Sequence, residues 1–271
     1  MAVLAARLRR VAGLALLAAG MALPGPALAV FGGSTVADTD PLAKTMAAII
    51  YHTADGTHLC TAVALAPRLL LTAAHCTGGE RSLIRIVFGV DLHYVTADRS
   101  RAVADIAVPP STAAAKGLPA YENPDDLALV LLDRAAPAGT RFAAIADDEP
   151  GATSVRVAGY GATSELRQAA GLGPQQLGFD QVLRSATEPL RPKGPDLLVA
   201  DQTRGAGVCT GDSGGPAFAA GGTSGVVGVL IGVASPRGNN DYCRGTAYFV
   251  ALERWKGWIT ATAKGFGQPL P

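Results

Sequence analysis

Short apolar runs, separated by turn residues, make up most of the chain beyond its amino-terminal segment. Gly, Pro, Asp and Asn bound these runs and interrupt regular structure between them. Runs of this length with such boundaries are typical of strands in an antiparallel sandwich or barrel. In chain order they are TMAAIIYHT, CTAVALA, RLLLTAA, LIRIVFGV, DLALVLL, SVRVAGY, GVVGVLIGVA and TAYFVAL. We therefore expect an all-β fold.

The main exception is the tail, residues 252–264. In its sequence, LERWKGWITATAK, Trp255 and Trp258 stand three residues apart and share one side of a helix. We interpret both tryptophans as packing residues of a short C-terminal helix rather than as a ligand site. Residues 141–154, RFAAIADDEPGATS, are the predicted crossing between two halves of the chain.

The first 29 residues have the features of a signal peptide. A basic region at residues 7–10 precedes an apolar run at residues 11–23, and Ala27 and Ala29 supply the small residues of a cleavage site. The apolar run is shorter than the about 20 residues that a membrane-spanning helix needs. We expect cleavage before Val30, and a secreted or periplasmic protein that is not bound to a membrane once the signal is removed.

Length and charge limit the partners. Without the signal peptide, 242 of the 271 residues remain, which fits either two ordinary domains or one unit of two barrels. The formal net charge falls from +1 to −2, because three arginines leave with no acidic residue. The chain has no basic block, so we expect neither nucleic acid nor an anionic membrane as a partner.

The four cysteines fit an exported protein. An even number of cysteines in an oxidising compartment predicts two disulfides. A metal site built from His58, Cys60, His75 and Cys76 is the alternative, but the spacing of these residues matches no common zinc pattern. We therefore expect no metal.

Three stretches carry candidate chemistry: LTAAHC (71–76), DDLALVLL (125–132) and GVCTGDSGGP (207–216). Taken singly, they are a histidine beside a cysteine, an acidic turn before a strand, and a glycine-rich turn. Together, in the order His, Asp, Ser, they resemble the trypsin-like (chymotrypsin-fold) serine protease family. The resemblance extends from VFGG through VAGYGATS to the tryptophan-containing tail.

This resemblance implies an architecture and a function. The fold would be two packed antiparallel six-stranded β-barrels, chymotrypsin-like, with the cleft between them and a short C-terminal helix. Residues 30–145 would form the first barrel and residues 146–271 the second barrel with the helix. The protein would be a monomeric endopeptidase without a cofactor, and its partners would be protein or peptide substrates and protein inhibitors.

The resemblance also assigns roles to residues. Ser213 would attack the carbonyl, His75 would take its proton, and Asp126 would orient the imidazole, because a serine hydroxyl needs a neighbouring base and the base needs a partner. Asp125 competes for the last role, but Asp126 is followed directly by the alternating apolar strand. The amides of Gly211 and Ser213 match the oxyanion hole, where loss of one donor costs ~10²–10³ in rate. The implied disulfides are Cys60 with Cys76 and Cys209 with Cys243.

The new amino terminus has an expected role as well. In the family a free terminus folds into the body and pairs with the aspartate before the serine, which here gives Val30 and Asp212. Signal peptidase alone would expose Val30, so we expect no zymogen stage. A histidine base must be neutral and a buried terminal amine must be charged, so activity is expected at neutral to mildly alkaline pH.

The substrate pocket is less well defined. Six residues before the serine stands Gly207 rather than an aspartate, so strong preference for Lys or Arg is not expected. The wall candidates are Ser235, Arg237 or Gly238, and Thr246. A glycine floor with small walls favours a medium apolar or aromatic side chain, whereas an inward Arg237 would attract an acidic residue.

Two other functions remain open. An esterase would use the same acyl-enzyme chemistry, and a catalytically silent binding protein could use the same scaffold, because fold does not fix function. Silent relatives commonly lose a triad or oxyanion residue, and none is missing from this sequence. His52, His58 and His93 lie outside the constellation and are interpreted as structural or surface residues.

Overall fold

The structure is a computed structural model. It describes residues 30–54, 56–111, 117–146, 152–163, 181–191, 194–219, 222, 225–235 and 242–270. The predicted signal peptide and the pocket candidates Arg237 and Gly238 lie outside the described residues.

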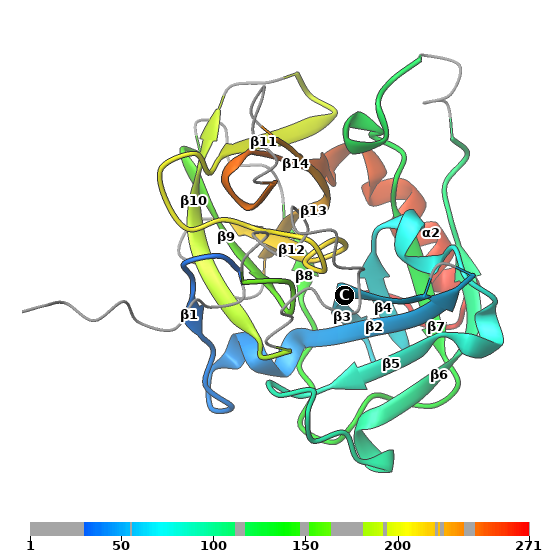
Figure 1. The fold of residues 1–271 in the computed structure, drawn as a ribbon. Helices are drawn as coiled ribbons and strands as arrows, with labels where there is room; N and C mark the ends of the chain where they lie inside the picture. The colour runs from blue at the N-terminus through cyan, green and yellow to red at the C-terminus, as the bar shows by residue number, and fades with distance from the viewer. Residues whose placement is uncertain are drawn as a thin grey trace, which may run out of the picture.

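Six antiparallel strands close the first barrel in the order β2-β3-β4-β7-β6-β5. It occupies the lower right of Figure 1, from blue to green. Five of its strands are the apolar runs expected in the first half, and their buried apolar side chains fill the barrel. The sixth strand, β6, was not among the predicted runs. Their bounds are β2 (Met46–Thr53), β3 (Gly56–Ala66), β4 (Leu69–Thr72), β5 (Arg85–Phe88), β6 (Ser100–Ala107) and β7 (Ala128–Leu132).

A second ring of six strands runs β10-β11-β14-β13-β12-β9 and closes where β9 pairs with β10. Two short strands extend it: β1 pairs with β10, and β8 pairs in parallel with β13. The bounds are β1 (Ser34–Thr35), β8 (Ala144–Ile145), β9 (Ser154–Gly159), β10 (Arg184–Arg191), β11 (Leu197–Asp201), β12 (Pro216–Ala219), β13 (Gly225–Ala234) and β14 (Thr246–Ala251).

The described helices are short. Helix α2 (Lys256–Gly265) lies beside the first barrel, where it contacts β7 and buries Ile259 and Ala263 (Figure 1). The remaining pieces are 3-10 turns: η1 (Pro41–Thr45), η2 (Ala74–Thr77), η3 (Arg81–Leu83), η4 (Ala97–Arg99), η5 (Ala120–Glu122), η8 (Tyr242–Arg244) and η9 (Glu253–Trp255). Among the described residues, no helix is long and apolar enough to cross a membrane.

The two barrels pack face to face. Tyr160, fully buried just after β9, donates a hydrogen bond from its hydroxyl to the carbonyl oxygen of Gly89, 2.9 Å away at the end of β5. One apolar cluster includes residues of both barrels and of α2. The predicted all-β fold of two six-stranded barrels with a short C-terminal helix is confirmed. Strand β1 lies early in the chain but pairs with β10 of the second barrel. Helix α2 lies late in the chain but packs against β7 of the first barrel.

Candidate active site

Neighbouring strands bring the histidine and an aspartate together. His75 lies in η2, directly after β4, and Asp126 lies just before β7, the strand that pairs with β4. The backbone N–H of His75 donates to Oδ1 of Asp126 at 2.9 Å, and His75 Nδ1 lies 2.7 Å from Oδ2. These two bonds fix the position and the plane of the imidazole ring.

The competing aspartate faces another partner. The side chain of Asp125 is 1% exposed, and its Oδ1 lies 3.3 Å from Nη2 of Arg254. Asp126 is therefore the carboxylate at the histidine, as the sequence pattern favoured. Arg254 was not foreseen, because it lies 129 residues from Asp125 in the chain.

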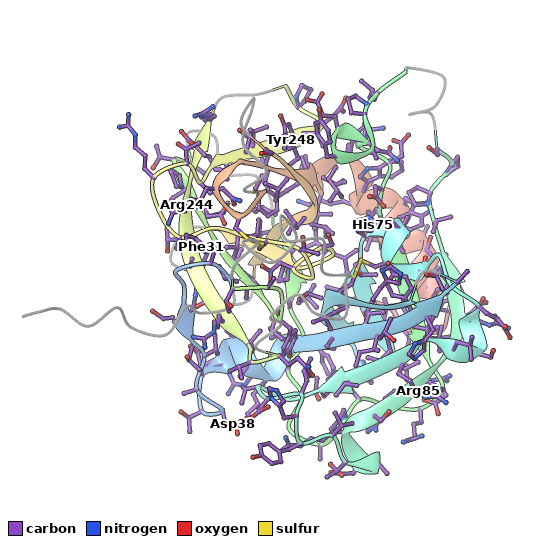
Figure 2. The ribbon with its side chains drawn as sticks, in the orientation of Figure 1. Phe31, Asp38, His75, Arg85, Arg244 and Tyr248 are labelled. Carbon is purple, nitrogen blue, oxygen red and sulfur yellow. A yellow bond between two sulfur atoms is a disulfide. The ribbon has the colours of Figure 1, made fainter. Side chains whose placement is uncertain are left out.

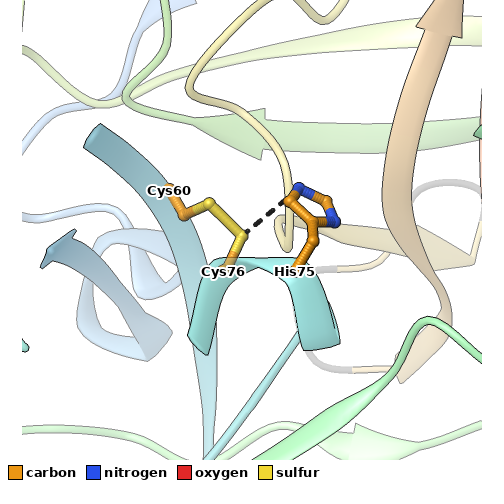
Figure 3. Close-up of side chains that lie close together, drawn as sticks. All are labelled: Cys60, His75 and Cys76. Atoms are coloured by element: carbon orange, nitrogen blue, oxygen red, sulfur yellow. Dashed lines mark hydrogen bonds between the residues drawn. A yellow bond between two sulfur atoms is a disulfide. The ribbon is translucent and has the colours of Figure 1, made fainter. Parts of the chain in front are cut away.

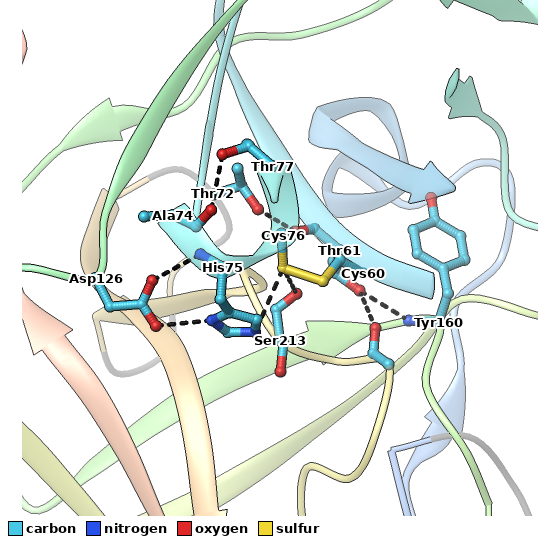
Figure 4. Close-up of a disulfide and its surroundings, with 11 residues drawn as sticks. Cys60, Thr61, Thr72, Ala74, His75, Cys76, Thr77, Asp126, Tyr160 and Ser213 are labelled. Carbon is cyan, nitrogen blue, oxygen red and sulfur yellow. Dashed lines mark hydrogen bonds and ion pairs between the residues drawn. A yellow bond between two sulfur atoms is a disulfide. The ribbon is translucent and has the colours of Figure 1, made fainter. Parts of the chain in front are cut away.

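The nucleophile loop is held by the first barrel. Thr61 on β3 donates its backbone N–H to the carbonyl of Ser213 at 2.8 Å and its hydroxyl to the carbonyl of Gly211 at 3.1 Å. Cys76 Sγ lies 3.5 Å from the carbonyl oxygen of Ser213 and 3.7 Å from His75 Nε2. Figure 3 shows the disulfide beside the ring of His75, and Figure 4 shows His75, Cys76 and Ser213 grouped together. The structure thus brings Ser213 next to His75.

Glycines flank the serine because the loop leaves no room. Gly214 has a φ of +79°, and a Cβ atom there would lie 2.0 Å from Oγ1 of Thr72 and 2.4 Å from the carbonyl of Thr61. Gly211 has a φ of +94°, a region that side-chain-bearing residues rarely adopt. The backbone conformation therefore favours glycine at 211 and 214, and at Gly214 the close approach of β3 and β4 excludes a side chain.

Asp212 is fully buried behind the serine. Its Oδ1 accepts the N–H of Gly161 at 2.7 Å and its Oδ2 accepts the N–H of Cys209 at 2.8 Å. Burial raises the pKa of this carboxyl to about 7, although the two N–H groups oppose the rise. A Cβ at Gly161 would lie 2.6 Å from Cγ of Asp212, and one at Gly159 would lie 2.1 Å from its Oδ1. The glycines of VAGYG make room for this carboxylate.

The segment that begins at Val30 lies beside the same loop. Val30 is completely buried in the apolar cluster of the second barrel. Phe31 forms an antiparallel bridge with Gly207, whose N–H donates to the Phe31 carbonyl at 2.8 Å. The Phe31 ring packs on the disulfide between Cys209 and Cys243, with Arg244 stacked on it at 4.6 Å (Figure 2). The ion pair of Val30 with Asp212 stays a prediction.

Two buried polar side chains that the sequence analysis missed hold Val208. The N–H of Val208 donates to Oε1 of Glu188 at 2.9 Å, and its carbonyl accepts from Nε2 of Gln202 at 2.8 Å. Neither side chain is exposed to solvent. Burial, followed by the charge of Asp212, raises the pKa of Glu188 to about 8. In the sheet Glu188 on β10 is paired with Val155 on β9. The sequence offered no stronger signal than an acidic residue in this strand.

The predicted pocket residues are partly placed. A Cβ added to Gly207 would lie 2.6 Å from three atoms of Gln202, so Gln202 fills the space that the glycine leaves. Ser235 follows the last residue of β13, and Thr246 stands opposite Ala234 at the same end of the sheet. These assignments remain predictions.

Both implied disulfides are present. Cys60 is joined to Cys76, and Cys209 to Cys243. Cys60, His75 and Cys76 lie close enough to suggest a metal site, but both sulfurs are in a disulfide and are not thiolates, the form in which cysteine binds a metal. His58 instead bonds to the hydroxyl of Thr53 at 2.7 Å. The metal alternative therefore loses its cysteine ligands.

Comparison with known proteins identifies the family. The family model described as Trypsin matches residues 31–259. The chain belongs to the trypsin family. No curated protein matched this trypsin-family chain.

Solved structures agree on the fold. A human heparin binding protein is 20% identical and superposes with a TM-score of 0.63, over 89% of this chain and 99% of that one. An inactivated protease paralogue of the scabies mite is 19% identical with a TM-score of 0.65, over 86% and 99% of the two chains. At these identities the likeness shows the trypsin-family fold alone.

Proposed function

We propose that this trypsin-family chain is an exported serine endopeptidase that uses Ser213, His75 and Asp126. The observation that carries the proposal is the pair of bonds from His75 to Asp126, 2.9 Å from the backbone N–H and 2.7 Å at Nδ1. With a proton on Nδ1 donated to the carboxylate, Nε2 is free to accept the proton of the serine hydroxyl.

The chemistry then follows from the positions. The Ser213 hydroxyl attacks the carbonyl carbon of the substrate while Nε2 of His75 takes its proton. The negative charge on the carbonyl oxygen is stabilised by the amides of Gly211 and Ser213. The histidine returns the proton to the leaving amine, and water, activated by the same histidine, releases the acyl group. Asp126 stabilises the imidazolium throughout.

Activation by signal cleavage is part of the proposal. In the chain with its leader attached, Val30 has a φ of +41°, which is unfavourable for a β-branched residue. Asp212 is buried with a pKa raised to about 7, so a nearby cation would stabilise its charged form. Cleavage before Val30 releases the strain and creates an ammonium group beside the loop. Both changes favour the ion pair of Val30 with Asp212.

Specificity is proposed to exclude Lys and Arg at the cleaved bond. Gly207 brings no charge, and the space beside it contains the neutral side chain of Gln202. An apolar residue of medium size fits this floor better than a cation. The residue before the cleaved bond is therefore the readout for this assignment.

Hydrolysis by the mature protein tests the proposal. The secreted protein is incubated with a peptide library and with matched amide and ester substrates, beside a Ser213→Ala variant. We expect amide cleavage by the wild type, cuts mainly after apolar residues, and none by the variant. Cutting of esters alone would support an esterase. A folded protein that cuts neither would support a catalytically silent binding protein on the same scaffold.

A further inference from the structure

Two adjacent carboxylates enter the site from the same turn. Asp125 and Asp126 have side chains that are 1% and 9% exposed. Asp126 bonds to His75 through both of its carboxylate oxygens, and Asp125 pairs with Arg254. A second buried negative charge one residue away is costly unless a cation balances it. It would also favour the protonated imidazole.

Arg254 supplies that balance from the far end of the chain. It lies in η9, where its Nη2 is 3.3 Å from Oδ1 of Asp125 and its Nη1 is 2.8 Å from Oδ1 of Asp196. The guanidinium stacks on the ring of Trp255 at 4.7 Å from the centroid. Trp255 in turn donates its Nε1–H to the carbonyl of Pro124 at 2.9 Å. Arg254 and Trp255 thus both bond to the loop that precedes Asp126.

We propose that Arg254 is a positioning residue for the catalytic pair: it neutralises Asp125 and holds the loop so that Asp126 alone serves His75. The proposal rests on the proposed function only for its consequence in catalysis. Its electrostatic part concerns the histidine itself and is measurable in a protein that cuts nothing. Arg254 lies outside the three sequence motifs that carry the candidate chemistry.

Other charges around the site are arranged so that they do not replace Arg254. On β2, Tyr51 has its pKa raised by burial and by the charge of Asp126, so it is neutral near pH 7. Asp196 is half exposed and screened by solvent. Glu253 and Lys256 pair with each other at 3.0 Å. On η5, Glu122 accepts a hydrogen bond from Tyr248. Arg254 forms an ion pair with Asp125 at 3.3 Å.

Histidine titration tests this directly. The mature protein carrying Ser213→Ala is labelled in its histidine rings, and the titration of His75 is followed by NMR. We expect Arg254→Ala to raise the midpoint, because Asp125 loses its ion pair with Arg254. Asp125→Asn removes one negative charge near His75 while Arg254 keeps its bond to Asp196, and it is expected to lower the midpoint. The double variant is expected to return to the starting value.

Controls separate charge from structure. Arg254→Lys keeps the cation and is expected to keep the midpoint, and Asp196→Asn, which removes the exposed partner, is expected to change it little. If Arg254→Ala does not fold, the downward shift in Asp125→Asn carries the test, because that variant keeps the bond to Asp196. Unchanged midpoints in both single variants would overturn the proposal. Absence of peptide hydrolysis by the wild type would instead refute only the proposed function.

In the active protein the same shifts are expected in the acid limb of kcat/KM. A residue that merely supports the fold would lower kcat/KM equally at every pH, and Asp125→Asn would not restore the profile of Arg254→Ala. Movement of the limb in opposite directions by the two single variants is the result that a structural role does not produce.

Discussion

Replacing Glu188 with Gln changes the pH dependence of stability by an amount that the structure sets. Glu188 is completely buried, and burial raises its pKa from 4.5 to about 8. In the folded protein the carboxyl group of Glu188 keeps its proton up to about pH 8, whereas in the unfolded chain it releases the proton above pH 4.5. The stability associated with this proton is therefore present below pH 4.5 and is lost as the pH rises toward 8. At pH 7 the loss is about 3 kcal/mol, at about 1.4 kcal/mol per pH unit.

Glu188→Gln removes this titration while it keeps the oxygen that accepts the N–H of Val208. The amide also places an N–H where Oε2 has no hydrogen-bond partner among the described residues, but that cost is the same at every pH. The variant is therefore expected to gain about 3 kcal/mol relative to wild type between pH 4.5 and pH 7. The slope of the difference, rather than its absolute value, is the prediction.

Urea unfolding at several pH values measures this slope. Both proteins carry Ser213→Ala, which removes the proposed nucleophile as a precaution against self-digestion, and both keep their disulfides. Glu253→Gln is the matched control, because this carboxylate is 55% exposed and pairs with Lys256; its difference from wild type is expected to stay within about 0.5 kcal/mol. A stability difference for Glu188→Gln that does not change with pH would refute the reasoning.

Three further substitutions test the close contacts of the loop. Gly161→Ala puts a methyl group 2.6 Å from the buried carboxylate of Asp212. This variant is expected to lower kcat/KM by about 100-fold, as loss of an oxyanion donor does. Gly257→Ala is the control, because its methyl group has nothing within 4 Å, and it is expected to leave peptide hydrolysis unchanged. Thr61→Val removes a hydroxyl that bonds across the barrels at 3.1 Å and is expected to destabilise the protein to heat and urea by about 1–3 kcal/mol, while Thr61→Ser is expected to lose much less; equal losses would contradict the role of the hydroxyl. Gly207→Asp collides with Gln202, so a peptide library is expected to reveal no new cutting after Lys or Arg, and efficient cutting there would show that the space is open.

The sequence was sufficient for the features that depend on local pattern. The apolar runs became strands, and the motif LTAAHC placed His75 at the end of β4. Asp126 was preferred to Asp125 because the alternating apolar strand follows it directly, and in the structure Asp126 Oδ2 lies 2.7 Å from His75 Nδ1. Its catalytic role stays a prediction. The glycines around the serine were expected from resemblance, and close contacts explain them physically.

The features that were missed depend on long-range packing. Glu188 looks like an ordinary polar residue of a strand until the barrel closes and turns it inward against Val208. Gln202 follows the end of β11, and only the folded loop places it against Gly207. Arg254 meets Asp125 because α2 returns to the first barrel. The spacing of residues along a single sequence does not reveal such long-range contacts.

Labelling with a serine-directed fluorophosphonate tests the central claim most directly. The secreted protein is weighed intact before and after treatment, and the adduct is mapped to a peptide. We expect the mass of the untreated protein to correspond to a chain that begins at Val30 and contains two disulfides. We expect a single adduct on Ser213, which His75→Ala abolishes. A folded protein with that amino terminus that takes no label would contradict the assignment of an activated serine. A longer amino terminus with no label would contradict activation by signal cleavage.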